Sequence, residues 1–148
     1  MIGKKLLMLG IGLLVLSLTN TNAEETQKTI EGTWIPVSAE VGGQKLPDDA
    51  LKGTKLVLKD GQYFYHNDRG VDQGTYKLLT VDDSQAMDIN GTEGPNKGRT
   101  FLAIYELSGD SLKICYDLEG KARPKQFKTE KGTKQFLAEY KRAVPKVP

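Results

Sequence analysis

The stretch Glu31-Gly32-Thr33-Trp34 begins the first strand-like segment of the sequence, which runs from Ile30 to Val41. Glycine allows close packing where a strand starts, and tryptophan covers a large area while its indole N–H needs a hydrogen-bond partner. A basic side chain from the last strand can lie across the indole face, and Arg142 is the candidate. These three residues, Gly32, Trp34 and Arg142, predict a plug that closes one end of a small antiparallel β-barrel.

The N-terminal residues have the pattern of an export signal. Two lysines precede an uncharged apolar stretch from Leu6 to Leu18, and a short polar exit ends at Ala23. A membrane-spanning helix needs about 20 apolar residues, so a cleaved signal is favoured over an uncleaved membrane anchor. We expect a signal peptide at 1–23, a single domain at 24–148, and a periplasmic or extracellular protein without a transmembrane anchor.

Removal of the signal changes the charge. It lowers the number of Lys and Arg residues from 21 to 19, equal to the 19 Asp and Glu residues. A balanced charge does not favour nucleic acid as a partner. The basic residues are concentrated between Lys121 and Lys146, where Glu130 and Glu139 are the only acids. This region is either a patch for anionic envelope polymers or lipid headgroups, or a solvated face whose lysines protect a strand edge.

The mature chain reads as short β segments separated by turn residues, at a spacing typical of all-β domains. Asp60-Gly61 lies between two alternating runs and predicts a hairpin, and the Gly91–Gly98 segment predicts a flexible loop. The predicted strands are Ile30–Val41, Thr54–Lys59, Gln62–Asn67, Gln73–Thr80, Ala86–Asn90, Arg99–Leu107, Ser111–Asp117, Pro124–Thr129 and Thr133–Ala143. Together with one helical turn at 47–53, they predict an all-β, up-and-down, lipocalin-like barrel of about 8–9 strands.

Aromatic and apolar residues on the central strands are candidates for the barrel interior. They line either a pocket for a small apolar or amphipathic ligand or an ordinary packed core. The candidate ligand-binding residues are Tyr63, Tyr65, Tyr76, Phe101, Tyr105, Leu112, Ile114 and Tyr116. On the strand 111–117, alternation places Leu112, Ile114 and Tyr116 on the inner face.

The segment from Phe101 to Leu107 is apolar on both faces, so its outer face should be covered. The turn at 47–53 or a partner chain is the expected cover. Cys115, the single cysteine, alternates to the outer face, where it lies exposed or under a loop. As a thiol it is a buried core group, an intermolecular bridge or a reactive group.

No catalytic or metal-binding pattern is present in the sequence. His66 is the only histidine, and Asp48-Asp49 and Asp82-Asp83 fall at turns without a calcium-loop pattern. Nucleophile-elbow and phosphate-loop motifs are absent. We therefore expect a protein that is not an enzyme and has no cofactor and no metal.

A resemblance extends from about Glu31 to Arg142. It rests on Glu31–Trp34, Gly74–Tyr76, Ile104–Leu107, Gly109–Tyr116, and Arg123-Pro124 with Phe127. These segments resemble a small bacterial lipocalin-like domain family known chiefly from planctomycetes, which has no assigned activity. The early Gly-x-Trp paired with a late Arg is similar to the lipocalin superfamily. The resemblance implies the barrel fold and leaves the function open.

Two functions follow as hypotheses. The first is an exported, non-enzymatic barrel that binds a small apolar or amphipathic molecule at the end opposite Trp34. The second is a protein-interaction module of the cell envelope that uses the outer face and the basic C-terminal strands.

Overall fold

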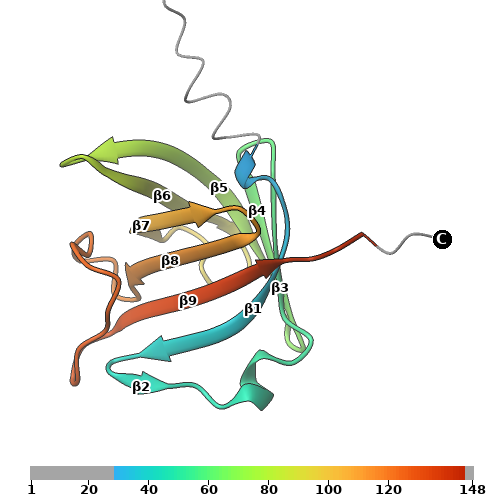
Figure 1. Cartoon of the computed structure of the whole chain (residues 1–148), viewed down its shortest axis with the longest axis horizontal. Coiled ribbons are helices and arrows are strands. Elements are labelled where there is room, and N and C mark those ends of the chain that lie inside the picture. Colours follow the sequence, from blue (N-terminus) through green and yellow to red (C-terminus); the bar gives the residue numbers. More distant parts are fainter. Residues whose placement is uncertain (1–28, 146–148) are drawn as a thin grey trace, which may run out of the picture.

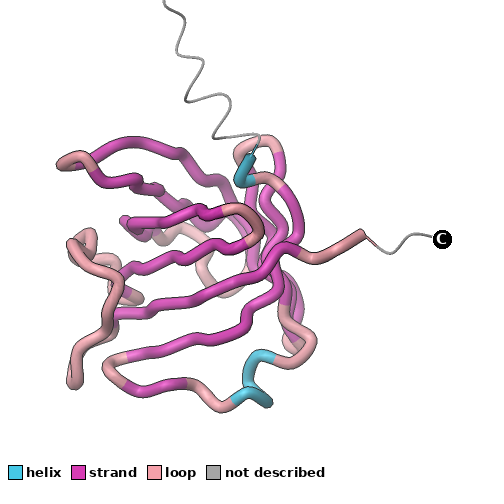
Figure 2. The backbone as a smooth tube through the Cα atoms, in the orientation of Figure 1, coloured by secondary structure: helices cyan, strands magenta, loops and turns pink. Residues whose placement is uncertain are grey.

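The computed structural model describes residues 29–145, and these residues form one antiparallel barrel (Figure 1). Strands occupy most of this part of the chain, and the helical pieces are single short turns (Figure 2). The predicted signal at 1–23 lies outside the described residues. Within residues 29–145, no helix is long and apolar enough to cross a membrane.

Eight strands close the barrel. Their order in the sheet is that of the sequence, β1-β3-β4-β5-β6-β7-β8-β9, and β1 also pairs with β9. A ninth strand, β2, pairs with the end of β1. The bounds are β1 Gly32–Val41, β2 Gln44–Lys45, β3 Lys55–Lys59, β4 Gln62–Asn67, β5 Gly70–Val81, β6 Ser84–Glu93, β7 Thr100–Ser108, β8 Ser111–Asp117 and β9 Gln135–Arg142. The predicted all-β barrel is confirmed, and closure leaves no long sheet edge unpaired.

Local sequence accounts for most element boundaries. Asp60 and Gly61 both have positive φ, as the two-residue turn between β3 and β4 requires. The predicted helical turn is a 3-10 turn, η1, at Asp48–Leu51, which follows Pro47. The short strand β2 was not predicted, because two exposed polar residues carry no alternating pattern.

The strand predicted at Pro124–Thr129 is wrong. The chain between β8 and β9 contains no strand, and instead crosses the outside of the barrel as an extended covering segment, residues 118–134. Pro124 is buried, and Lys113 Nζ of β8 lies 5.6 Å from the centre of the Phe127 ring. Burial of these apolar side chains against the sheet face, together with the missing N–H of proline, outweighs pairing at an edge.

The covering segment also corrects the expected cover of β7. Arg123 donates from Nη1 to the carbonyl of Ala103 at 2.7 Å and pairs from Nη2 with Asp88 Oδ1 at 2.6 Å. These bonds fix the segment over β6 and β7. The outer face of β7, including the buried Ile104, is therefore covered by the chain itself and not by the turn at 47–53.

Cys115 is on the outer face, as alternation predicts, and is fully buried beneath the covering segment. Its Sγ lies 3.8 Å from the carbonyl oxygen of Lys128. Burial raises the pKa of the Cys115 thiol to about 11. The buried-thiol interpretation holds, so at neutral pH the group is a protonated, shielded thiol.

Candidate functional site

The two ends of the barrel follow from its topology. Strands alternate in direction, so the turns at 60–61, 82–83 and 109–110 lie at the end where β1 begins. We call this the sealed end. The connections at 67–70, 94–99 and 118–134 lie at the other end, which we call the open end. In Figure 1, the connection between β8 and β9 is on the opposite side of the view from the C-terminal end of β9.

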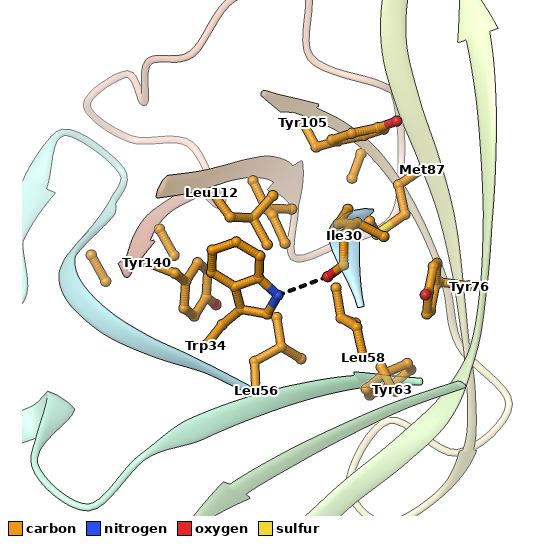
Figure 3. Packing of buried hydrophobic residues seen from close by; sticks show 14 residues of the cluster. Ile30, Trp34, Leu56, Leu58, Tyr63, Tyr76, Met87, Tyr105, Leu112 and Tyr140 are labelled. Atoms are coloured by element: carbon orange, nitrogen blue, oxygen red, sulfur yellow. Dashed lines mark hydrogen bonds between the residues drawn. The ribbon is translucent and has the colours of Figure 1, made fainter. Parts of the chain in front are cut away.

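Trp34 fills the sealed end. Its side chain is fully buried, and its indole N–H donates to the carbonyl of Ile30 at 2.9 Å, drawn as the dashed line in Figure 3. The guanidinium carbon of Arg142 lies 4.3 Å from the centre of the Trp34 ring, within cation–π range. Trp34 and Arg142 are partners in the register of β1 and β9, which places them opposite each other.

Arg142 binds the chain that enters β1. Its Nη1 donates to the carbonyl of Glu31 at 2.6 Å, its Nη2 donates to the carbonyl of Thr29 at 2.7 Å, and its Nε pairs with Asp110 at 3.1 Å. Gly32 has a φ of +139°, and a Cβ there would lie 2.8 Å from Arg142 Nη1. Glycine is required at this position both by the backbone and by the space that Arg142 occupies.

A cavity of about 410 Å³ occupies the interior toward the open end. This volume is within the range of about 300–1,000 Å³ typical of small-molecule sites. Its wall is mainly apolar and aromatic. The lining residues are Leu56, Leu58, Tyr63, Tyr65, Asn67, Arg69, Gly70, Val71, Asp72, Tyr76, Met87, Ile89, Pro95, Asn96, Phe101, Ile114, Tyr116, Phe136 and Tyr140.

The sequence-predicted ligand-binding residues divide between the cavity and the core. Six of the eight line the cavity: Tyr63, Tyr65, Tyr76, Phe101, Ile114 and Tyr116. The other two, Tyr105 and Leu112, belong to the packed cluster around Trp34, with exposed fractions of 4% and 1% (Figure 3). Their side chains contribute to the core and do not reach the cavity wall. A ligand-binding role of the six remains a prediction.

A buried carboxylate at the open end was missed by sequence reasoning. Asp72 is 8% exposed, and its Oδ2 accepts from the Tyr63 hydroxyl at 3.1 Å and from Asn96 Nδ2 at 2.8 Å. Its Oδ1 accepts from the Asn96 backbone N–H at 3.0 Å. Burial, and then the Asp72 charge, raises the pKa of Tyr63, so that its hydroxyl stays protonated and donates. Asp72 and Tyr76 share a strand face, a signal that alternation could have supplied.

The same carboxylate fixes the loop at 94–99 against β5. A Cβ at Gly94 would lie 2.7 Å from the carbonyl oxygen of Val71, so the loop backbone packs directly on the strand. The Gly91 N–H donates to the Arg99 carbonyl at 2.9 Å across the neck of the loop. The predicted flexible loop is therefore shorter than expected, because β6 continues to Glu93, and it is held by defined hydrogen bonds.

Three tyrosine hydroxyls in the cavity wall have no hydrogen-bond partner among residues 29–145: Tyr65, Tyr116 and Tyr140. In the same part of the chain, every fully buried side-chain N or O atom is paired, so these hydroxyls open onto the cavity. Burial raises the pKa of Tyr116 and that of Tyr140. Both hydroxyls are protonated at neutral pH and can donate to a bound molecule.

His66 and the acidic pairs do not build a metal site with other ligands. Across the part of the chain that the structure describes, no group of three His, Cys, Asp or Glu side chains is placed to hold a metal ion. Asp49 instead pairs with Lys52 at 2.5 Å on the surface, and Asp82 and Asp83 form the turn between β5 and β6 with positive φ.

Comparisons with known proteins add one solved structure. The chain is similar to the crystal structure of a DUF4847 family protein from Bacteroides vulgatus, with 17% sequence identity and a TM-score of 0.47. The match covers 78% of this chain and 94% of that one. No family model and no curated protein matches the chain. The resemblance to the planctomycete family therefore remains a prediction, and the barrel is established by the strand pairing described above.

Proposed function

We propose that this protein is an exported, non-enzymatic barrel that binds a small amphipathic molecule through its open end. The observation that carries the proposal is the cavity of about 410 Å³ with the three unpartnered hydroxyls of Tyr65, Tyr116 and Tyr140 in its wall. Apolar walls favour an apolar body, and unpaired donors favour acceptor atoms on the same molecule. A molecule with both properties is amphipathic.

The hydroxyls of Tyr65, Tyr116 and Tyr140 are accessible from the cavity, because no fully buried side-chain N or O atom within residues 29–145 lacks a partner. Each hydroxyl can therefore exchange a hydrogen bond to water for one to an acceptor atom of a bound molecule. At the sealed end, by contrast, the Trp34 indole N–H and the Arg142 guanidinium are all paired within the chain. Among residues 29–145, the hydroxyls of Tyr65, Tyr116 and Tyr140 therefore lie in a wall that has room for a ligand beside it.

The interaction-module alternative rested on the two apolar faces of the segment 101–107 and on the basic C-terminal strands. The first support is lost, because residues 118–134 of the same chain cover the outer face of that segment. The small-molecule function is therefore the one that the geometry favours.

Binding of a neutral fluorescent dye, N-phenyl-1-naphthylamine, tests the proposal. We expect saturable binding by the mature protein, and a co-purified small molecule in native mass spectrometry would identify the ligand. Ile89→Trp places a large ring in the cavity, and Val71→Trp places one at its rim. Both should abolish dye binding, while Lys77→Trp, on the exposed outer face of β5, should leave it unchanged.

Circular dichroism of each variant separates a blocked cavity from a misfolded barrel. The rim variant serves where the interior variant fails to fold, because Val71 is 42% exposed and is not part of the core. Absence of saturable dye binding by the wild-type protein would overturn the proposal.

A further inference from the structure

We propose that the ligand is an organic anion with an aromatic ring, whose ring lies in the cavity and whose negative group pairs with Arg69 at the rim. The inference rests on the proposed function and specifies the class of molecule. It is carried by two independent features of the cavity, its aromatic wall and its one uncommitted charge.

The wall is built from rings on opposite sides of the barrel. On β7, β8 and β9, the Phe101, Tyr116 and Phe136 rings form a continuous row, with centroids 5.3 and 5.2 Å apart and both interplanar angles at 53°. On another part of the barrel wall, β4 and β5 contribute Tyr65 and Tyr76. Tilted and offset ring contacts favour an aromatic ligand over a flexible chain, because rings fit such walls in defined geometries.

The charge of the ligand follows from the two charged residues in the wall. Both oxygens of Asp72 accept hydrogen bonds from the neutral groups of Asn96 and Tyr63, which occupy the carboxylate without cancelling its charge, so the negative group of the ligand is placed beside Arg69 at the rim. Arg69 is exposed at the rim, and its side chain makes no ion pair or hydrogen bond within residues 29–145. Asp68, beside it, is exposed and is not part of the cavity wall. A guanidinium with free donors next to an apolar cavity fits a carboxylate or sulfonate.

A pair of dyes that share a fluorescent body tests the sign of the charge. 8-Anilinonaphthalene-1-sulfonate carries the N-phenylnaphthylamine body of the neutral dye together with one sulfonate. We expect Arg69→Gln to raise the Kd of the sulfonate dye about fivefold, the size expected for an exposed charge pair, and to change the Kd of the neutral dye less than twofold. Added salt should raise the Kd of the sulfonate dye more than that of the neutral dye.

Lys97→Gln is the matched control. Lys97 is an exposed cation on the neighbouring loop at 94–99 and is outside the cavity wall, so its loss removes one positive charge near the open end without touching the site. Its effect on either dye should stay below twofold. Arg69→Glu should raise the Kd of the sulfonate dye further than Arg69→Gln does.

Three results would overturn the inference while leaving the proposed function intact. In the first, Arg69→Gln lowers the affinity for both dyes equally. In the second, Arg69→Gln leaves the affinity for the sulfonate dye unchanged. In the third, Lys97→Gln lowers the affinity for the sulfonate dye as selectively as Arg69→Gln does. Failure of both dyes to bind the wild-type protein would instead overturn the proposed function itself. Circular dichroism controls the fold, and Arg69 is a surface residue whose replacement leaves the core unchanged.

Discussion

The side chains that close the sealed end and several of those that line the open end differ in how their polar groups are paired within residues 29–145. At the sealed end, Trp34 is completely buried and its N–H, like all three donor nitrogens of Arg142, finds an acceptor in the chain. At the open end, three tyrosine hydroxyls and the guanidinium of Arg69 find none within residues 29–145. Paired groups stabilise a fold, whereas unpaired ones at a cavity are available to a ligand. The contrast separates the part of the molecule that holds the structure from the part that can act.

Two arginines, one at each end, show the same difference between a paired and an unpaired side chain. Arg142 lies across an indole ring and binds two backbone carbonyls that precede β1. Arg69 lies in the turn between β4 and β5 and is exposed. The first should matter for stability and the second for binding, and four experiments test that division.

Trp34→Ala should have the largest effect. Removal of a fully buried tryptophan leaves a large cavity and frees the Ile30 carbonyl, so we expect a loss of about 3–5 kcal/mol in the free energy of unfolding. Urea denaturation followed by circular dichroism measures it. A loss below about 1 kcal/mol would mean that the sealed end does not hold the barrel together.

Arg142→Met should cost about 3 kcal/mol, because two carbonyls of the chain entering β1 lose a charged donor and the indole loses its cation. Arg69→Met is the matched change at the open end and should alter stability by less than about 0.5 kcal/mol. Equal losses in the two variants, measured by urea denaturation, would contradict the proposed division between the ends.

Gly32→Ala should cost about 2–3 kcal/mol. The change forces an L side chain into a φ of +139° and pushes against Arg142 Nη1 at 2.8 Å. Gly98→Ala, at a φ of +80° with no atom within 4 Å, isolates the backbone strain and should cost about 1 kcal/mol. The excess at Gly32, read from thermal denaturation, reports the contact with Arg142. Identical costs would show that Arg142 moves aside freely.

The smallest stability effects concern single hydroxyls. Tyr63→Phe deletes a donor to the buried Asp72 and should lose about 1–2 kcal/mol. Tyr116→Phe and Tyr140→Phe delete hydroxyls without partners and should stay within about 0.5 kcal/mol of the wild type. Tyr116→Phe and Tyr140→Phe should instead lower the affinity of the protein for the molecule that co-purifies with it. A large stability loss in Tyr116→Phe would indicate that its hydroxyl serves the fold.

Local patterns predicted most of the strands but not the path between β8 and β9. Asp60-Gly61 specifies its turn through positive φ at both residues, so that hairpin could be read directly. Pro124 and Phe127 have the apolar character of a strand, yet they pack on the outside of β7 and β8. Nothing local distinguishes an apolar residue that extends a sheet from one that covers it, because the difference depends on which surface is left uncovered.

Prediction of the candidate site was partial for a similar reason. Alternation placed Ile114 and Tyr116 inside, but it could not say how deep each residue lies along the barrel. Leu112 has the same parity as Ile114 and faces the core around Trp34, not the cavity. Asp72 and Arg69 were missed because a charged residue near a turn is usually solvated, and only the surrounding strands show that one is buried and the other borders the cavity.

Local sequence patterns were enough to predict the barrel and its sealed end. Gly32 and Trp34 lie at the start of the first strand and Arg142 at the end of the last, so these residues meet once the two strands are neighbours. Three features depend on the folded chain: the interior cavity of about 410 Å³, the wall hydroxyls that lack partners within residues 29–145, and the cover of the outer face by residues 118–134. Turn chemistry and side-chain alternation act between neighbours in sequence. Cavity volume, burial and pairing are sums over residues that only the closed barrel brings together.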